Sequence, residues 1–140
     1  MNRNGNEQKN LLSLTILVLF SSIGFIYPQT AGHLLSPLEA SNLIAKDTAI
    51  IILDVRTPAE YKSETGHLKK AILIPVQELE KRIDELNKYR GKEIIAYCRT
   101  GHRSTAATEI LLKHGYNVMN MSGGITQWNV EKLPTVKEAQ

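Results

Sequence analysis

Short apolar runs alternate with longer segments of helical pattern along most of the chain. The runs are rich in β-branched residues and have the length of buried strands, and they lie at 49–53, 71–74, 94–97 and 116–119. Helical patterns precede or separate them, at 37–46, 58–63, 78–89 and 104–114. This alternation predicts a single α/β domain, in which a parallel sheet of four to five strands carries helices on both faces.

Capping signals set the ends of two predicted helices. Residues 36–39, Ser-Pro-Leu-Glu, form a capping box with Pro37 at the first helical position. Ser104 is the expected N-cap of the helix at 104–114, and Gly115 is its expected left-handed stop. The face that this helix is expected to bury carries Ala106, Ala107, Ile110 and Leu111.

An apolar segment near the N-terminus is typical of a targeting sequence. Residues 11–26 are mostly apolar, and Arg3 and Lys9 precede them. This length lies between a signal-peptide core, about 7–15 residues, and a membrane-spanning helix, about 17–25 residues. We therefore expect residues 1–31 to be a signal peptide or a membrane anchor, followed by a domain at 32–132 and a C-terminal tail at 133–140. Either outcome exports the domain to the periplasm or another extracytoplasmic space, soluble after cleavage or membrane-anchored.

Charge, cysteine count and histidine spacing argue against a nucleic-acid partner, an internal disulfide and a metal site. The net charge is only +3, and Lys and Arg are scattered along the chain, so no nucleic-acid partner is indicated. The single cysteine permits no internal disulfide. His33, His102 and His114 show no metal-ligand spacing with each other or with Cys98, so we expect no metal site.

The candidate chemistry lies at Cys98, which directly follows the apolar run at 94–97. Five residues, 99–103, with Gly101 in the middle, connect this cysteine to the next predicted helix. A strand, a short loop and a helix N-terminus direct several backbone N–H groups, and the positive end of the helix dipole, at one point. Such surroundings lower the pKa of a thiol, so we expect Cys98 to be a thiolate nucleophile. The alternative is a buried structural cysteine.

The loop after Cys98 is expected to bind an anionic substrate. Arg99 and Arg103 supply the positive charge, and the amides of residues 99–104 would stabilise an anion on the sulfur. The side chain of His102 could contact a substrate or face water. The predicted substrate-binding residues are Arg99, Thr100, Gly101, His102 and Arg103, with Ser104 as a support.

Asp54 and Arg56 follow the apolar run at 49–53. In parallel α/β sheets ligands bind beyond the carboxyl ends of strands, so these two residues are expected on the same edge of the sheet as Cys98. Sulfur transfer needs no carboxylate beside a thiolate, which favours a structural role for Asp54 as an acceptor of loop amides. Arg56 is expected to form an ion pair with Glu60 that braces this edge.

Four segments in order, at 53–61, 66–75, 98–104 and 122–128, are similar to signatures of the rhodanese family of sulfurtransferases. The resemblance covers about residues 36–128. It implies a doubly wound parallel sheet with a minor first strand near residues 33–35. It also makes Asp54 and Arg56 supports of the active loop and His67 a turn residue.

Three functions follow as hypotheses. In the first, Cys98 takes sulfur from a small anionic donor such as thiosulfate, without a cofactor, and passes it as a persulfide to a thiol, a protein or cyanide, the assay acceptor that the resemblance implies. The second is a cysteine phosphatase or arsenate reductase, but those loops place five residues between cysteine and arginine, whereas four separate Cys98 from Arg103. The third is a sulfur-relay or binding module in the cell envelope, with possible membrane association through residues 11–26.

The residue at position 100 bears on the choice of donor. Rhodanese relatives that use thiosulfate tend to carry a second basic residue at the position that matches Thr100, whereas those that use 3-mercaptopyruvate have small or hydroxyl residues there. Arg99 fits the first group and Thr100 the second. Thiosulfate is favoured because Arg99 and Arg103 are both cationic.

Overall fold

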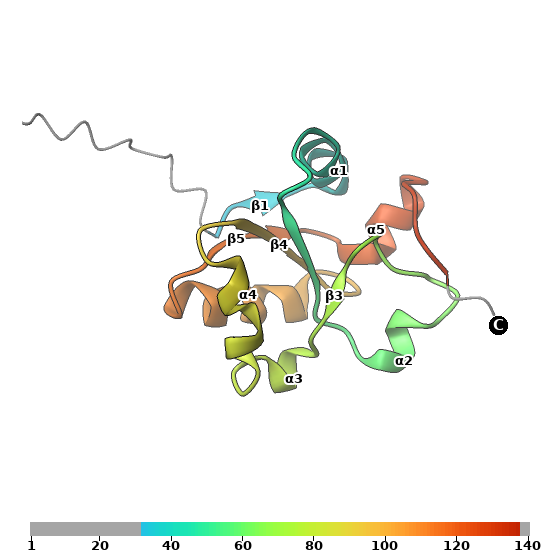
Figure 1. The fold of residues 1–140 in the computed structure, drawn as a ribbon. Coiled ribbons are helices and arrows are strands. Elements are labelled where there is room, and N and C mark those ends of the chain that lie inside the picture. Colours follow the sequence, from blue (N-terminus) through green and yellow to red (C-terminus); the bar gives the residue numbers. More distant parts are fainter. Residues whose placement is uncertain (1–31, 138–140) are drawn as a thin grey trace, which may run out of the picture.

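A computed structural model describes residues 32–137, which form a five-stranded sheet with helices on both faces (Figure 1). The strands are β1 (Leu34–Leu35), β2 (Ile51–Asp54), β3 (Ile72–Leu73), β4 (Glu93–Tyr97) and β5 (Asn117–Met121). The α-helices are α1 (Pro37–Lys46), α2 (Pro58–Tyr61), α3 (Val76–Leu79), α4 (His102–Lys113) and α5 (Gly124–Val130), and a 3-10 helix, η1, spans Ile83–Tyr89. The strand order is β1-β5-β4-β2-β3, and every pairing is parallel. The predicted α/β fold is confirmed.

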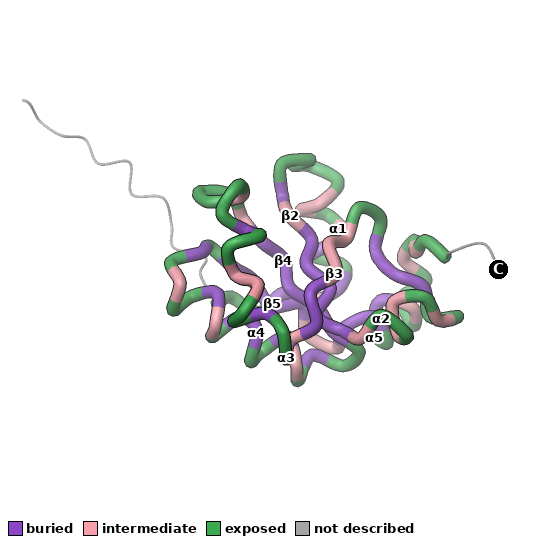
Figure 2. Tube along the Cα trace, turned by 60° about the horizontal axis from the view of Figure 1, so that its bottom comes forward, coloured by how far each residue is buried: buried purple, intermediate pink, exposed green. Residues whose placement is uncertain are grey.

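Alternate residues of the central strand β4 serve two separate cores. Ile94 and Ala96 belong to a cluster that α3, η1 and α4 cover, whereas Ile95 and Tyr97 belong to a cluster that α1 and α5 cover. Because successive side chains of a strand point to opposite faces, a strand segment buried on both faces must be apolar throughout, as residues 94–97 of β4 are, whereas Glu93 at its start is only partly buried. Figure 2 shows the buried residues gathered along these central strands.

Two local predictions at the start of the domain are confirmed. The Glu39 amide donates to the Ser36 hydroxyl at 3.3 Å, and the Ser36 amide donates to the Glu39 carboxylate at 2.8 Å, which completes the capping box of α1. The minor first strand is present as β1, in which Leu34 pairs with Asn120 and Leu35 with Met121 of β5.

The prediction of one continuous helix at 78–89 is wrong, because the structure divides this segment into α3 and η1. Ile83, Leu86 and Tyr89 all pack against the core that α3 and α4 share. Their spacing is three residues, which matches the three residues per turn of a 3-10 helix and places all three side chains on one face. The helix α5 was not predicted.

The predicted start of α4 is also wrong. The N-cap is Gly101, with φ of 102°, and not Ser104, so the helix begins at His102. This positive φ is a conformation that glycine adopts without the steric cost of a Cβ atom. Within the helix Ala106 is exposed rather than buried, and Thr108 is buried instead.

The segment after α5 contacts the domain. Residues His67 and Val136 form an antiparallel bridge with backbone hydrogen bonds of 2.9 and 2.8 Å, and the Trp128 indole donates to the carbonyl of Pro134 at 3.1 Å. Residues 133–137, which the sequence assigns to a tail, therefore run back along the domain. The predicted targeting segment lies outside the described residues.

Within residues 32–137, no helix combines the length and the apolar character needed to cross a bilayer.

Candidate active site

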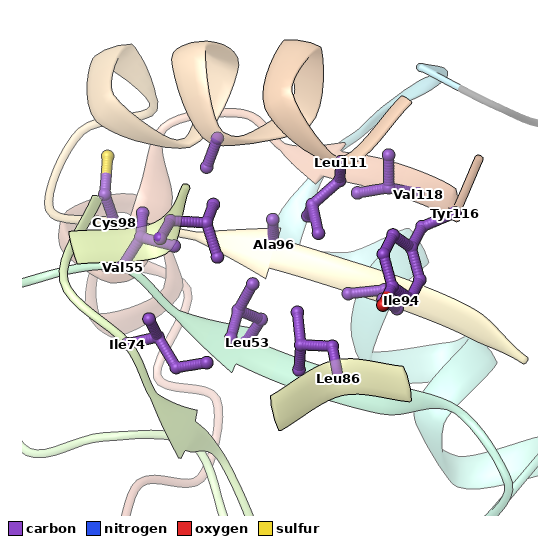
Figure 3. Close-up of a cluster of buried hydrophobic side chains, with 12 residues drawn as sticks. Leu53, Val55, Ile74, Leu86, Ile94, Ala96, Cys98, Leu111, Tyr116 and Val118 are labelled. Carbon is purple, nitrogen blue, oxygen red and sulfur yellow. The ribbon is translucent and has the colours of Figure 1, made fainter. Parts of the chain in front are cut away.

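Cys98 lies just beyond the carboxyl end of β4, and its sulfur points toward α4 (Figure 3). The residue is only 1% exposed. The amide of Gly101 donates a hydrogen bond to Sγ at 3.1 Å, and the hydroxyl of Ser104 lies 3.6 Å from the same atom. Thus the loop and the first turn of α4 surround the sulfur with hydrogen-bond donors.

These donors outweigh the effect of burial on the thiol. Burial raises the pKa of Cys98, but the Ser104 hydroxyl and the backbone amides of Ser104, Gly101 and Thr100 lower it more, so that the pKa lies below its ordinary value. A thiol of this kind ionises more readily than a free cysteine, and its thiolate is the nucleophilic form.

The N-terminus of α5 sets the direction of the loop amides. Its Ile125 amide donates to the Cys98 carbonyl at 2.9 Å, and its Thr126 amide donates to the Arg99 carbonyl at 3.0 Å. In a trans peptide the C=O and the following N–H point in opposite directions. The hydrogen bond from Thr126 holds the Arg99 carbonyl on the side of the loop that faces α5. The N–H of Thr100 therefore points to the opposite side, toward the sulfur of Cys98.

Gly124 permits this close approach of α5. A Cβ atom at this position would lie 2.6 Å from the carbonyl carbon and oxygen of Arg99, and closer still to the carbonyl oxygen of Cys98. Its φ is +55°, in the left-handed region that favours glycine. The sequence analysis includes Gly124 only in the segment 122–128 that resembles the rhodanese family, and it did not find the contact with the loop.

Arg103, expected to bind substrate, forms a two-pronged ion pair with Glu60. The distances are 2.6 and 2.7 Å, and the two side chains are 26% and 28% exposed. The predicted ion pair of Arg56 with Glu60 is therefore wrong, because Glu60 turns its carboxylate to Arg103. Hydrogen bonds from Arg103, and from Thr57 at the start of α2, lower the pKa of Glu60 to about 2. Glu60 thus connects α2 to the first turn of α4.

Asp54 and Arg56 form a buried ion pair on the same edge of the sheet. The distance is 2.7 Å, and both residues are at most 1% exposed. Arg56 also donates to the carbonyls of Glu60 and Gly66 and to the Thr65 hydroxyl, so all three of its guanidinium nitrogens are engaged by the protein. Asp54 accepts one backbone amide, that of Arg56, at 3.0 Å. The guanidinium also lies 5.6 Å from the ring centre of Tyr97, the residue before Cys98.

Arg99 and His102 are exposed at the rim of the loop. A pocket of about 220 Å³ adjoins it, lined by Arg56, Glu60, Ser63, Thr65 and Arg99. Arg99 has no ion-pair partner among residues 32–137, unlike Arg56 and Arg103. A larger pocket of about 380 Å³ includes Ile51 at the start of β2, and so lies at the end of the sheet away from Cys98.

In the described part of the chain, no three His, Cys, Asp or Glu side chains come together in a way that could hold a metal ion.

A five-stranded parallel α/β fold, with one cysteine between the end of a central strand and a helix N-terminus, defines the class of this domain. The family described as the rhodanese-like domain matches residues 36–131. The chain belongs to this family of sulfurtransferases and their relatives.

Three similar proteins illustrate the relationship. A protein named sulfurtransferase from Allochromatium vinosum is 35% identical over 97 residues, which are 69% of this chain and 87% of that protein. The crystal structure of a rhodanese-related protein from Thermoplasma volcanium has 33% identity and a TM-score of 0.68, and the match covers 76% of this chain and 99% of that one. A tRNA uridine(34) hydroxylase from Cytophaga hutchinsonii is 28% identical over 120 residues, and this chain spans only 38% of its length.

Proposed function

We propose that this protein is a sulfurtransferase that carries sulfur as a persulfide on Cys98. The thiolate attacks the outer sulfur of thiosulfate, a new S–S bond forms, and the bond between the two sulfurs of the donor breaks. Sulfite leaves with the electron pair of that bond. In the second step the acceptor, cyanide or a thiolate, attacks the outer sulfur of the persulfide and regenerates the Cys98 thiolate.

The observation that carries this proposal is the nearly covered thiol inside a cradle of N–H donors. With 1% of Cys98 exposed, a donor must present a small terminal atom, as thiosulfate does with its outer sulfur. The same N–H groups that favour the thiolate would favour a persulfide anion one bond further out. In a phosphate ester the atom that a nucleophile must attack is the central phosphorus, which four oxygens surround, so the nearly covered thiol supports sulfur transfer over phosphate chemistry.

Arg99 is the proposed binding group for the anionic part of the donor. It is exposed beside the loop and has no ion-pair partner among the described residues, whereas Glu60 already neutralises much of the charge of Arg103. Sulfite, or the equivalent anionic part of another donor, would therefore lie at the rim beside Arg99 while the outer sulfur enters the loop toward Cys98.

The intact mass of the full-length protein, measured before and after incubation with thiosulfate, tests this proposal. We expect a gain of one sulfur atom, about 32 Da, that is lost on addition of cyanide or a thiol. The Cys98→Ser variant is the matched control and should gain nothing. If thiosulfate, 3-mercaptopyruvate and polysulfide all leave the wild-type mass unchanged, the proposal is wrong, and a phosphatase substrate is the next to try.

We also propose that the protein acts outside the cytoplasm, on the strength of the apolar sequence at 11–26 and the basic residues before it. Fractionation of cells that produce the full-length chain tests this. Recovery of the protein in the cytoplasmic fraction at its full mass would contradict the proposal.

A further inference from the structure

A buried asparagine lies behind the active loop. Asn120 is in β5, is 4% exposed, and interrupts an otherwise largely apolar strand. Its side-chain amide nitrogen donates to the hydroxyl of Thr105 in α4 at 3.0 Å, while its Oδ1 atom has no hydrogen-bond partner among the described residues. Burial of an amide with an unmet acceptor is unfavourable, so stability alone gives no reason for asparagine here.

The Thr105 hydroxyl connects Asn120 to the loop. It donates to the carbonyl of Gly101 at 3.0 Å, and the Thr105 amide donates to the same carbonyl at 3.1 Å. A hydroxyl carries one proton. Because Thr105 accepts a hydrogen bond from Asn120, its proton is directed away from β5 and toward Gly101.

The Ser104 hydroxyl has two competing acceptors. Its oxygen lies 3.0 Å from the Gly101 carbonyl and 3.6 Å from Sγ of Cys98, and its single proton can serve only one of them at a time. The carbonyl is the nearer acceptor. A carbonyl oxygen has two lone pairs, and the amide and hydroxyl of Thr105 can fill both.

We propose that Asn120 and Thr105 are positioning residues, which satisfy the Gly101 carbonyl so that the Ser104 proton is free to hydrogen-bond to the sulfur of Cys98. The chain of contacts runs from Asn120 to Thr105 to Gly101, and its effect reaches the reacting atom through Ser104. The inference rests on the proposed function only in taking the Cys98 thiolate as the reacting group.

Alkylation of Cys98 by iodoacetamide across a pH series tests the proposal in the full-length protein. Thr105→Val removes the hydroxyl and keeps the shape, so the Ser104 proton should move to Gly101 and the pKa of Cys98 should rise by about one. Asn120→Leu should raise the pKa in the same direction. Thr108→Val is the matched control, because it removes a buried hydroxyl from the same helix that has no partner among the described residues. It should leave the profile unchanged.

A double-mutant comparison separates this relay from a general disturbance of the helix. In a Ser104→Ala background there is no hydroxyl to redirect, so Thr105→Val should raise the pKa of Cys98 no further, and Thr105→Ser should restore the wild-type profile when Ser104 is present. An unchanged profile in both Thr105→Val and Asn120→Leu, or an equal rise with and without Ser104, would overturn the proposal. Alkylation needs no sulfur donor, so a protein that shows the predicted profile but takes sulfur from no donor would refute only the sulfurtransferase function.

Discussion

Replacement of Gly124 by alanine should separate α5 from the loop that holds Cys98. The new Cβ would meet backbone atoms of residues 98 and 99, which cannot swing aside as a flexible side chain can. Relief of this overlap requires α5 to withdraw. Withdrawal breaks the hydrogen bonds of 2.9 and 3.0 Å from the amides of Ile125 and Thr126 to the loop carbonyls.

The expected loss of stability in Gly124→Ala has two parts, which a control variant can separate. A left-handed conformation costs a residue with a Cβ about 1 kcal/mol, and each lost backbone hydrogen bond costs about 1 kcal/mol, so Gly124→Ala should destabilise the domain by about 3 kcal/mol. Gly91 has a φ of +80°, and a Cβ atom added there would have no atom within 4 Å apart from its chain neighbours, so Gly91→Ala carries only the conformational part, about 1 kcal/mol.

Urea unfolding and the rate of Cys98 alkylation measure the two consequences. Gly124→Ala should lower the free energy of unfolding more than Gly91→Ala does, and it alone should slow alkylation near neutral pH, because the Thr100 amide is no longer held toward the sulfur. If the two variants lose equal stability and both react like the wild type, α5 does not orient the loop, and our account of the site is wrong.

Three further variants test the charged groups around the loop. Arg99→Ala should raise KM for thiosulfate about tenfold with a smaller fall in kcat, because a charge-assisted contact to the bound donor is lost, and steady-state kinetics that show equal falls in kcat and kcat/KM would remove Arg99 from the binding role. Glu60→Gln tests a pH dependence: because Arg103 lowers the pKa of Glu60 from 4.5 to about 2, the ion pair stabilises the fold above about pH 4.5, and this contribution is lost as the pH falls toward 2. The urea midpoints of Glu60→Gln and the wild type should thus differ most near neutral pH and converge in acid, and a constant difference would contradict the assignment. Arg56→Met leaves Asp54 buried without its partner and should cost about 3–5 kcal/mol in the same assay, most of which the double variant with Asp54→Leu should recover; an unchanged midpoint in the single variant would show that the pair does not stabilise the fold.

The sequence identified most elements because their signals are local. The apolar runs that became β2, β4 and β5, and the capping box of α1, depend on residues within a few positions of one another. The strand, loop and helix around Cys98 are likewise consecutive in the chain. The errors had local causes too. The apolar residues at 83, 86 and 89 have the three-residue spacing of a 3-10 helix, so the single helix predicted at 78–89 is divided into α3 and η1. The left-handed conformation of Gly101 lets α4 begin at residue 102, two residues before the predicted range.

By itself, the sequence determined the fold class, the place of Cys98 at the end of a buried strand, and the loop of amides that follows it, whereas the central position of that strand came from the structure. Only the tertiary structure decided which partners complete the site: Glu60 pairs with Arg103 rather than Arg56, α5 holds the loop carbonyls, and Asn120 reaches the loop through Thr105. Strand periodicity and helix caps are fixed by neighbours along the chain. The partner of a charge or an amide is instead chosen by distance and burial among groups far apart in sequence, which are brought together only when the sheet assembles.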